Sequence, residues 1–150
     1  MSDLRDLYQE VVIDHSKRPR NFRKMEDANH TAEGFNPLCG DRITLYLKLE
    51  GDRVADVAFQ GSGCAISTSS ASIMTEVLKG KTVAEAEKTF ERFHRLVTGE
   101  LQPGERAEDM GKLAVFGKVS DYPARVKCAS LAWHTLNSAL RDESKTVTTE

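Results

Sequence analysis

The sequence predicts an α+β fold, in which a small antiparallel sheet of about three strands has helices packed on one face. Apolar and polar residues alternate, as in strands, between about residues 42 and 60. Apolar residues recur at helical spacing between about residues 65 and 140. Strands that come first and helices that follow are typical of this class, whereas parallel sheets alternate the two.

The composition is that of one globular domain, which we expect to span residues 1–150. Apolar residues make up 39% and charged residues 29% of the chain. A net charge of -2 argues against a surface for nucleic acid, which usually needs a basic excess. No apolar run approaches the ~18 residues of a membrane helix, and the first residues lack a hydrophobic signal region. We therefore expect a cytoplasmic protein that binds neither nucleic acid nor membranes.

The strands are predicted from period-two patterns. Residues 42–50 alternate strictly, which indicates a half-buried strand with one apolar face, formed by Ile43, Leu45, Leu47 and Leu49. A turn at residues 50–53 leads into a partner strand at residues 54–60, so the two form a hairpin. The residues expected to face inward on the second strand are Ala55, Val57 and Phe59. Residues 28–35 are a candidate edge strand.

The helices are predicted from apolar spacing and capping signals. Residues 3–15 have the spacing of an amphipathic helix. A second helix follows Cys64, and a third begins at Thr82, which forms a capping-box pattern with Glu85. A long final helix spans residues 124–140. We expect a surface insertion near residues 98–119, which is rich in glycine and acidic residues, and a frayed tail at residues 142–150.

Three cysteines stand in contexts that suit metal binding. Cys39 precedes Asp41 by two residues, Cys64 ends a glycine turn before a helix, and Cys128 follows a helix start. Helix N-termini favour the thiolate form, and three thiolates with one carboxylate make a four-ligand set for zinc. Cysteines are also often plain core residues, and the long spacing alone does not decide between these two interpretations.

Four stretches of the chain resemble one protein family. They are Cys39-Gly40-Asp41, Gly-Ser-Gly-Cys-Ala-Ile-Ser at 61–67, Tyr-Pro-Ala-Arg-Val-Lys-Cys at 122–128, and Asp-His-Ser-Lys-Arg-Pro-Arg-Asn at 14–21. Together they resemble the NifU/IscU-like iron–sulfur assembly proteins, and the likeness runs from about Leu4 to Leu140. It implies the SufE/NifU-like fold.

Two departures point to the SufU branch of that family. Scaffold members have a histidine directly before the third cysteine, where this chain has Lys127. They also lack the extra stretch near residues 98–119. Both features resemble SufU members, which act as zinc-dependent sulfurtransferases that take sulfur from a SufS-type cysteine desulfurase, a pyridoxal-phosphate enzyme.

The resemblance implies a role for each site residue. It makes Cys39, Asp41, Cys64 and Cys128 the ligands of one Zn²⁺ per chain, and it makes Cys39 the residue that receives the persulfide sulfur. If a histidine of the desulfurase replaces Cys39 on zinc, the thiolate is released as a nucleophile. The sulfur would then pass to a downstream iron–sulfur scaffold. Arg125, one helical turn before Cys128, is a candidate for tuning the ligands or steering the persulfide.

Two alternatives remain open from the sequence. The chain could itself be a scaffold on which an iron–sulfur cluster is assembled and passed on, with Asp41 and the three cysteines as cluster ligands. It could also hold purely structural zinc, in which case loss of the metal would unfold it.

Overall fold

The computed structural model of the 150-residue chain describes residues 2–141 and 147–148, with side chains left out of account at residues 2–8, 108 and 147–148. In chain order the elements are α1 (Ser2–Lys17), β1 (His30–Asn36), β2 (Asp41–Glu50), β3 (Arg53–Ser62), α2 (Ala65–Leu78), α3 (Val83–Thr98), the 3-10 segments η1 (Ala107–Phe116) and η2 (Val119–Asp121), α4 (Pro123–Leu140) and β4 (Val147–Thr148).

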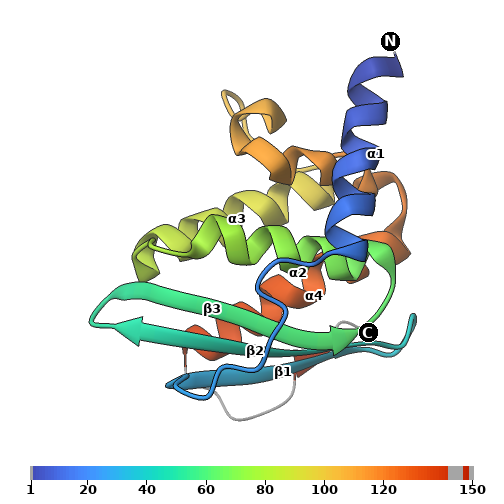
Figure 1. Ribbon diagram of the computed structural model, residues 1–150. Helices are drawn as coiled ribbons and strands as arrows, with labels where there is room; N and C mark the ends of the chain where they lie inside the picture. Colours follow the sequence, from blue (N-terminus) through green and yellow to red (C-terminus); the bar gives the residue numbers. More distant parts are fainter. Residues whose placement is uncertain (1, 142–146, 149–150) are drawn as a thin grey trace.

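The strands form one sheet in the order β3-β2-β1-β4, and Figure 1 labels the first three of these. β1 and β2 are antiparallel neighbours, as are β2 and β3. The predicted antiparallel sheet is therefore confirmed, including the candidate strand at residues 28–35. β4 adds a short parallel pairing, Gly34 with Val147 and Phe35 with Thr148, so β1 is not an edge. The rest of the expected frayed tail, residues 142–146 and 149–150, lies outside the described residues.

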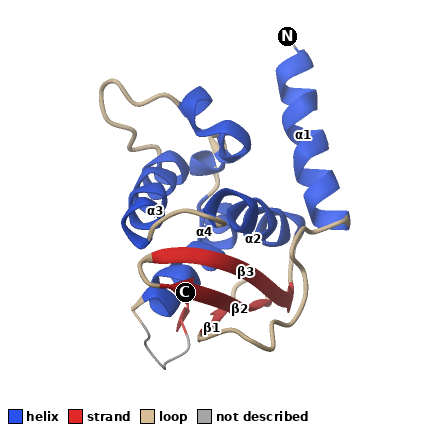
Figure 2. Cartoon of the chain, turned by 60° about the vertical axis from the view of Figure 1, so that its left-hand side comes forward, coloured by secondary structure: helices blue, strands red, loops and turns tan. Residues whose placement is uncertain are grey.

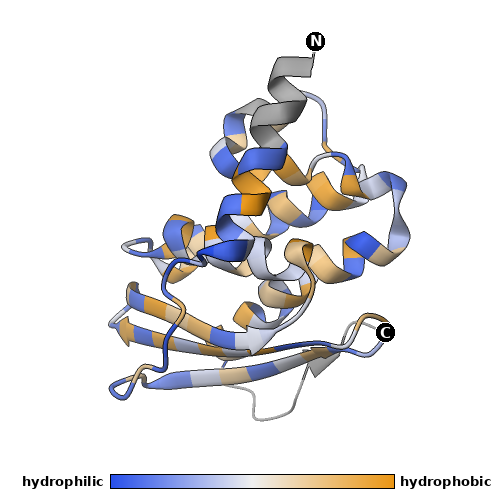
Figure 3. Ribbon diagram, turned by 45° about the vertical axis from the view of Figure 1, so that its right-hand side comes forward, coloured by the Kyte–Doolittle hydropathy of each residue, from blue (hydrophilic) through white to orange (hydrophobic). Residues whose placement is uncertain are grey.

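A bulge in the β2–β3 hairpin corrects one expectation. Lys48 pairs with Asp56 and Leu49 with Val54, so Ala55 has no partner across the ladder. An extra residue of this kind reverses the alternation of faces beyond it. Val54 is consequently buried in the core, whereas Ala55, which the simple period-two pattern placed inward, is only half-buried. Figure 3 shows the alternating hydropathy along both strands.

Helices cover one face of the sheet, as Figure 2 shows. α4 lies over β1 and β2, α2 lies over β3, and α1 and α3 pack outside them. The centre of the core is aromatic: Trp133 of α4 stacks on Phe93 of α3 with ring centroids 4.5 Å apart, and Phe116 meets Phe93 edge-on. Such aromatic pairs stabilise a core beyond the area they bury.

Two local features of the helices follow from the sequence. The capping box predicted at Thr82 is present, since its hydroxyl accepts from the Glu85 amide and the Glu85 carboxylate accepts from the Thr82 amide. The segment near residues 98–119 is mostly exposed in its first half, whereas Leu113 and Phe116 are buried, so its second half contributes to the core. In the described part of the chain, no helix is long and apolar enough to cross a membrane.

Candidate metal centre

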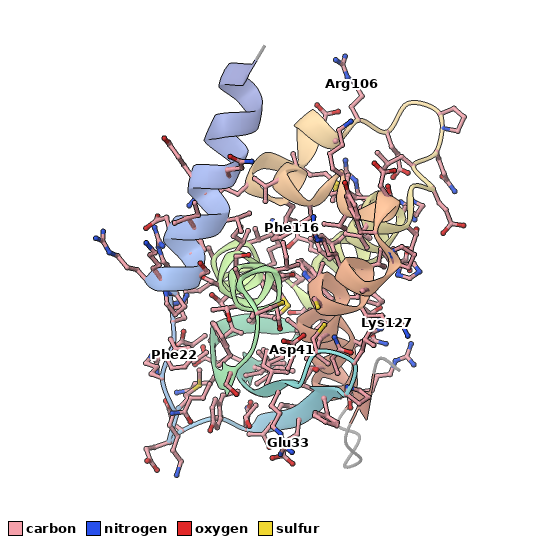
Figure 4. The ribbon with its side chains drawn as sticks, turned by 90° about the vertical axis from the view of Figure 1, so that its right-hand side faces the viewer. Phe22, Glu33, Asp41, Arg106, Phe116 and Lys127 are labelled. Carbon is pink, nitrogen blue, oxygen red and sulfur yellow. The ribbon has the colours of Figure 1, made fainter. Side chains whose placement is uncertain are left out.

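The loop between β1 and β2 presents Cys39 and returns Asp41 to the interior. Asn36 ends β1 opposite Asp41, the first residue of β2, and the Gly40 amide donates to the Asn36 carbonyl at 2.9 Å. Gly40 adopts the left-handed conformation, with φ of 73°, which glycine adopts without strain. Cys39 is thereby exposed at the loop, while Asp41 is fully buried. Figure 4 shows Asp41 inside the molecule, with Lys127 of α4 pointing away from it.

Close packing of α4 on β1 brings Cys128 to this loop. Gly34 lies directly beneath α4, since a Cβ on it would stand 2.1 Å from Thr135 Oγ1 and 3.0 Å from Leu131 Cδ1. One helical turn before Leu131, Cys128 therefore reaches the end of β1. Its Sγ is 3.3 Å from Cys39 Sγ, and the side chain is 2% exposed.

Three of the four predicted ligands converge. Ligand atoms of Cys39, Asp41 and Cys128 lie within 4.8 Å of one another, the one group of this kind among the described residues. The fourth, Cys64, lies outside this group but next to it: its amide donates to Asp41 Oδ1 at 2.9 Å. The Cys64 Sγ accepts from the Ser67 amide at 3.4 Å and so caps the N-terminus of α2.

The expectation that each cysteine lies where its thiolate is stabilised is wrong for Cys128. It is the sixth residue of α4, and the favourable effect of a helix N-terminus fades within the first turn. Burial instead raises the pKa of the Cys128 thiol well above its ordinary value, and the nearby Cys39, Cys64 and Asp41 side chains raise it further. In the absence of a cation, this thiol stays protonated.

Asn36 is a site residue that sequence reasoning missed. It is fully buried, and its amide nitrogen donates to Asp41 Oδ2 at 3.1 Å and to Cys128 Sγ at 3.5 Å. A signal was available, because Asn36 shares the inward-facing register of β1 with Ala32 and Gly34. A polar side chain at such a position needs hydrogen-bond partners, and the polar groups in reach are the ligands themselves.

The other candidates make contacts of their own. Arg125 is exposed, and its Cζ lies 4.5 Å from the centroid of the Tyr122 ring, a cation–π contact. His15 is buried and hydrogen-bonded through Nδ1 to the Ser72 hydroxyl at 2.7 Å. His134 packs edge-on against the ring of Phe90. His15 and His134 thus contribute to packing between helices.

Comparison with known proteins identifies the family. Residues 7–144 match the model of the NifU-like N terminal domain. The chain belongs to this family. Its relatives include the zinc-dependent sulfurtransferase SufU of Bacillus subtilis (strain 168), 39% identical over 142 residues and 95% of each chain. The iron–sulfur cluster assembly scaffold protein IscU of Streptococcus pyogenes serotype M1 is 38% identical over 141 residues, 94% of this chain and 87% of that one.

A solved structure shares the fold. FiSufU of Fervidobacterium islandicum AW-1, named an iron–sulfur cluster assembly scaffold protein for the SUF system, superposes with a TM-score of 0.81 at 39% identity, over 87% of this chain and 94% of the other. This member of the NifU-like family therefore belongs to the machinery of iron–sulfur cluster assembly. One relative of similar identity is named a sulfurtransferase and several are named scaffold proteins. Family membership therefore does not decide between these two roles.

The side chains at this site have the chemistry of metal ligands. Two thiols and a carboxylate converge, a third thiol lies alongside, and the buried Asp41 has no cationic side chain bonded to it in the described structure. Zinc takes thiolate and carboxylate ligands in tetrahedral sites. The soft thiolates also suit iron–sulfur clusters, whereas the carboxylate is a harder ligand than the fourth cysteine that such clusters usually have.

Proposed function

We propose that this protein is a zinc-dependent sulfur acceptor in iron–sulfur cluster biogenesis, which takes persulfide sulfur from a SufS-type cysteine desulfurase and stimulates that enzyme. The observation that supports this most directly is an asymmetry among the converging groups. Cys39 is exposed on a loop, whereas Asp41 and Cys128 are buried on β2 and α4. A partner protein can therefore reach one ligand of this trio without disturbing the other two.

Zinc held by Cys39, Asp41, Cys64 and Cys128 would keep the coordinating thiols deprotonated at neutral pH and would tolerate exchange of a ligand. This matters most for Cys128, whose burial otherwise raises its pKa. Asp41 and Cys128 would remain in place because they belong to regular elements. The loop of Cys39 can move away with less disruption, because it contains no helix or strand.

The transfer itself is a thiol–persulfide exchange. The Cys39 thiolate attacks the outer sulfur of the cysteine persulfide on the desulfurase. A new S–S bond forms to Cys39 as the S–S bond of the donor breaks, and the desulfurase cysteine leaves as a thiolate. No external oxidant or reductant is needed, because the sulfur moves at the same oxidation level.

The scaffold role is the second candidate, since a relative at 38% identity is named a cluster assembly scaffold. The same four side chains would then hold an iron–sulfur cluster. Lys127, which stands directly before Cys128, points away from Asp41 in Figure 4 and supplies no further ligand from that position. For the sulfur-acceptor role we also propose that Arg125, whose guanidinium lies over the Tyr122 ring at the exposed start of α4, attracts the negatively charged persulfide.

The decisive experiment is direct. The zinc-loaded protein is incubated with a SufS-type desulfurase and free cysteine, and added sulfur is located by peptide mass spectrometry. We expect one extra sulfur on Cys39, faster alanine production and retained zinc. The Cys39→Ser variant should accept no sulfur yet remain folded by circular dichroism. Absence of persulfide and of stimulation, together with iron-dependent colour on anaerobic reconstitution, would favour the scaffold instead.

A further inference from the structure

The buried amide of Asn36 stands between two of the proposed ligands. Its nitrogen donates to Asp41 Oδ2 and to Cys128 Sγ, at 3.1 and 3.5 Å. The orientation of the amide group follows from chemistry: an ionised carboxylate only accepts hydrogen bonds, so the NH₂ group must face Asp41. Cys39, the third member of the group, receives no hydrogen bond from Asn36 and instead accepts one from the Cys128 thiol.

The other end of the Asn36 side chain is unusual. Its Oδ1 is buried and has no hydrogen-bond partner among the described residues. Leaving a buried acceptor unpaired is unfavourable, and an apolar side chain of similar size would avoid that cost. The two hydrogen bonds that the amide donates, to Asp41 and to Cys128, are the contacts that an apolar residue could not make.

Asp41 is held at both of its oxygens. Oδ2 accepts from Asn36, and Oδ1 accepts from the Cys64 amide at 2.9 Å. Each carboxylate oxygen has two lone pairs, so either can still coordinate a cation. A carboxylate fixed at both ends and a thiol fixed by the same amide form a rigid pair. Cys39 and Cys64 are both exposed, but the Cys64 sulfur is held by the Ser67 amide at the start of α2, whereas Cys39 stands on a loop.

We propose that Asn36 is a positioning residue of the metal site: it fixes Asp41 and Cys128 as permanent ligands, so that Cys39 is the ligand that is released. This inference rests on the proposed function for the identity of the metal and for the need to release a ligand. An N–H···S hydrogen bond also withdraws charge from a coordinated thiolate, which makes Cys128 a weaker electron donor to the metal.

The test uses the full-length chain with Zn²⁺ or Co²⁺ as the probe. Asn36→Leu keeps the approximate volume of the side chain and removes the amide. We expect its zinc affinity, measured by competition with a chromophoric chelator, to fall about 10- to 100-fold, as is typical when a residue that orients a metal ligand is lost. In the Co²⁺ form, the thiolate-to-cobalt absorption band should move to longer wavelength, because Cys128 loses its hydrogen bond.

A matched control separates this effect from a general loss of stability. Asn29→Ala removes an asparagine that precedes the same strand and exchanges two hydrogen bonds with the backbone of Leu49. It should leave zinc affinity and the cobalt spectrum unchanged. If Asn36→Leu does not fold, Asn36→Ser serves in its place, since its hydroxyl can donate to only one of the two acceptors. A smaller loss of affinity is then expected.

A double-mutant cycle shows which ligands Asn36 acts through. Its substitution should still weaken zinc binding in a Cys39→Ser background and should weaken it much less in an Asp41→Ala background. The opposite pattern would overturn the proposal, as would unchanged affinity and an unchanged cobalt spectrum in the single variants. Because these measurements need only the metal, a chain that binds zinc but accepts no sulfur would refute the proposed function alone. A chain that binds no zinc would refute both.

Discussion

Gly63 is the position at which a single methyl group should most directly displace a ligand. A Cβ built on Gly63 lies 2.6 Å from Asp41 Oδ1 and 3.1 Å from Asp41 Cγ. Ordinary contacts to a Cβ begin at about 3.4 Å, and contacts under 3.0 Å essentially never occur. In a Gly63→Ala variant the carboxylate must therefore move away by about 0.4 to 0.8 Å. Ligand distances in metal sites are set to within about 0.2 Å, so a shift of this size is large enough to disturb metal binding.

The expected result is a loss of metal affinity with little effect on the metal-free fold. A displacement of this size stretches the bond from the Cys64 amide to Asp41 and moves the ligand oxygen out of place. We expect zinc binding to weaken about 10- to 100-fold, which corresponds to about 1.4 to 2.7 kcal/mol. The unfolding free energy of the metal-free protein should change by less than about 1 kcal/mol, because alanine also restricts the unfolded chain.

The assay is zinc competition with a chromophoric chelator, together with thermal unfolding with and without zinc. Ser62→Ala, an exposed substitution one residue earlier, is the control and should match the unaltered protein. The reasoning would be refuted by a Gly63→Ala variant with unchanged zinc affinity. It would also fail if Ser62→Ala lost affinity to the same degree.

Three further predictions concern stability. Gly34→Ala should lower the unfolding free energy by about 1–3 kcal/mol in denaturant titrations, because the new methyl group meets Thr135 Oγ1, and adding Thr135→Ala should recover part of the loss. Thr82→Ala should cost about 0.5–2 kcal/mol through loss of the α3 cap, and a neutral outcome in thermal melts would contradict that role. Burial lowers the pKa of His15, so the folded state binds fewer protons than the unfolded state; stability should fall as the pH drops below about 6.5, less steeply in His15→Gln.

Much of the fold could be predicted because local patterns agreed with it. The alternation in residues 42–50 and the capping box at Thr82 each depend on neighbours in the sequence, and both are confirmed. The inward placement of Ala55 was wrong because a bulge depends on how two strands pair, which the pattern of a single strand does not record.

The candidate metal ligands could be predicted from the sequence, but the pKa shift of Cys128 could not. Cys39, Asp41 and Cys128, which lie in the motifs at 39–41 and 122–128, converge in the structure. The raised pKa of Cys128 comes from its depth in the core, which depends on how closely α4 approaches β1 at Gly34. The assignment of Cys64 as a ligand stays a prediction, as does the role of Arg125.

The position of Cys64 at the start of α2 has a consequence for observing the site. Its sulfur accepts the Ser67 amide proton, and its own amide proton goes to Asp41. Binding of a cation to that sulfur would draw electron density away from the Ser67 contact. The amide resonance of Ser67 and its rate of exchange with deuterated solvent would then report occupancy from within the backbone, with no label attached to any of the cysteines.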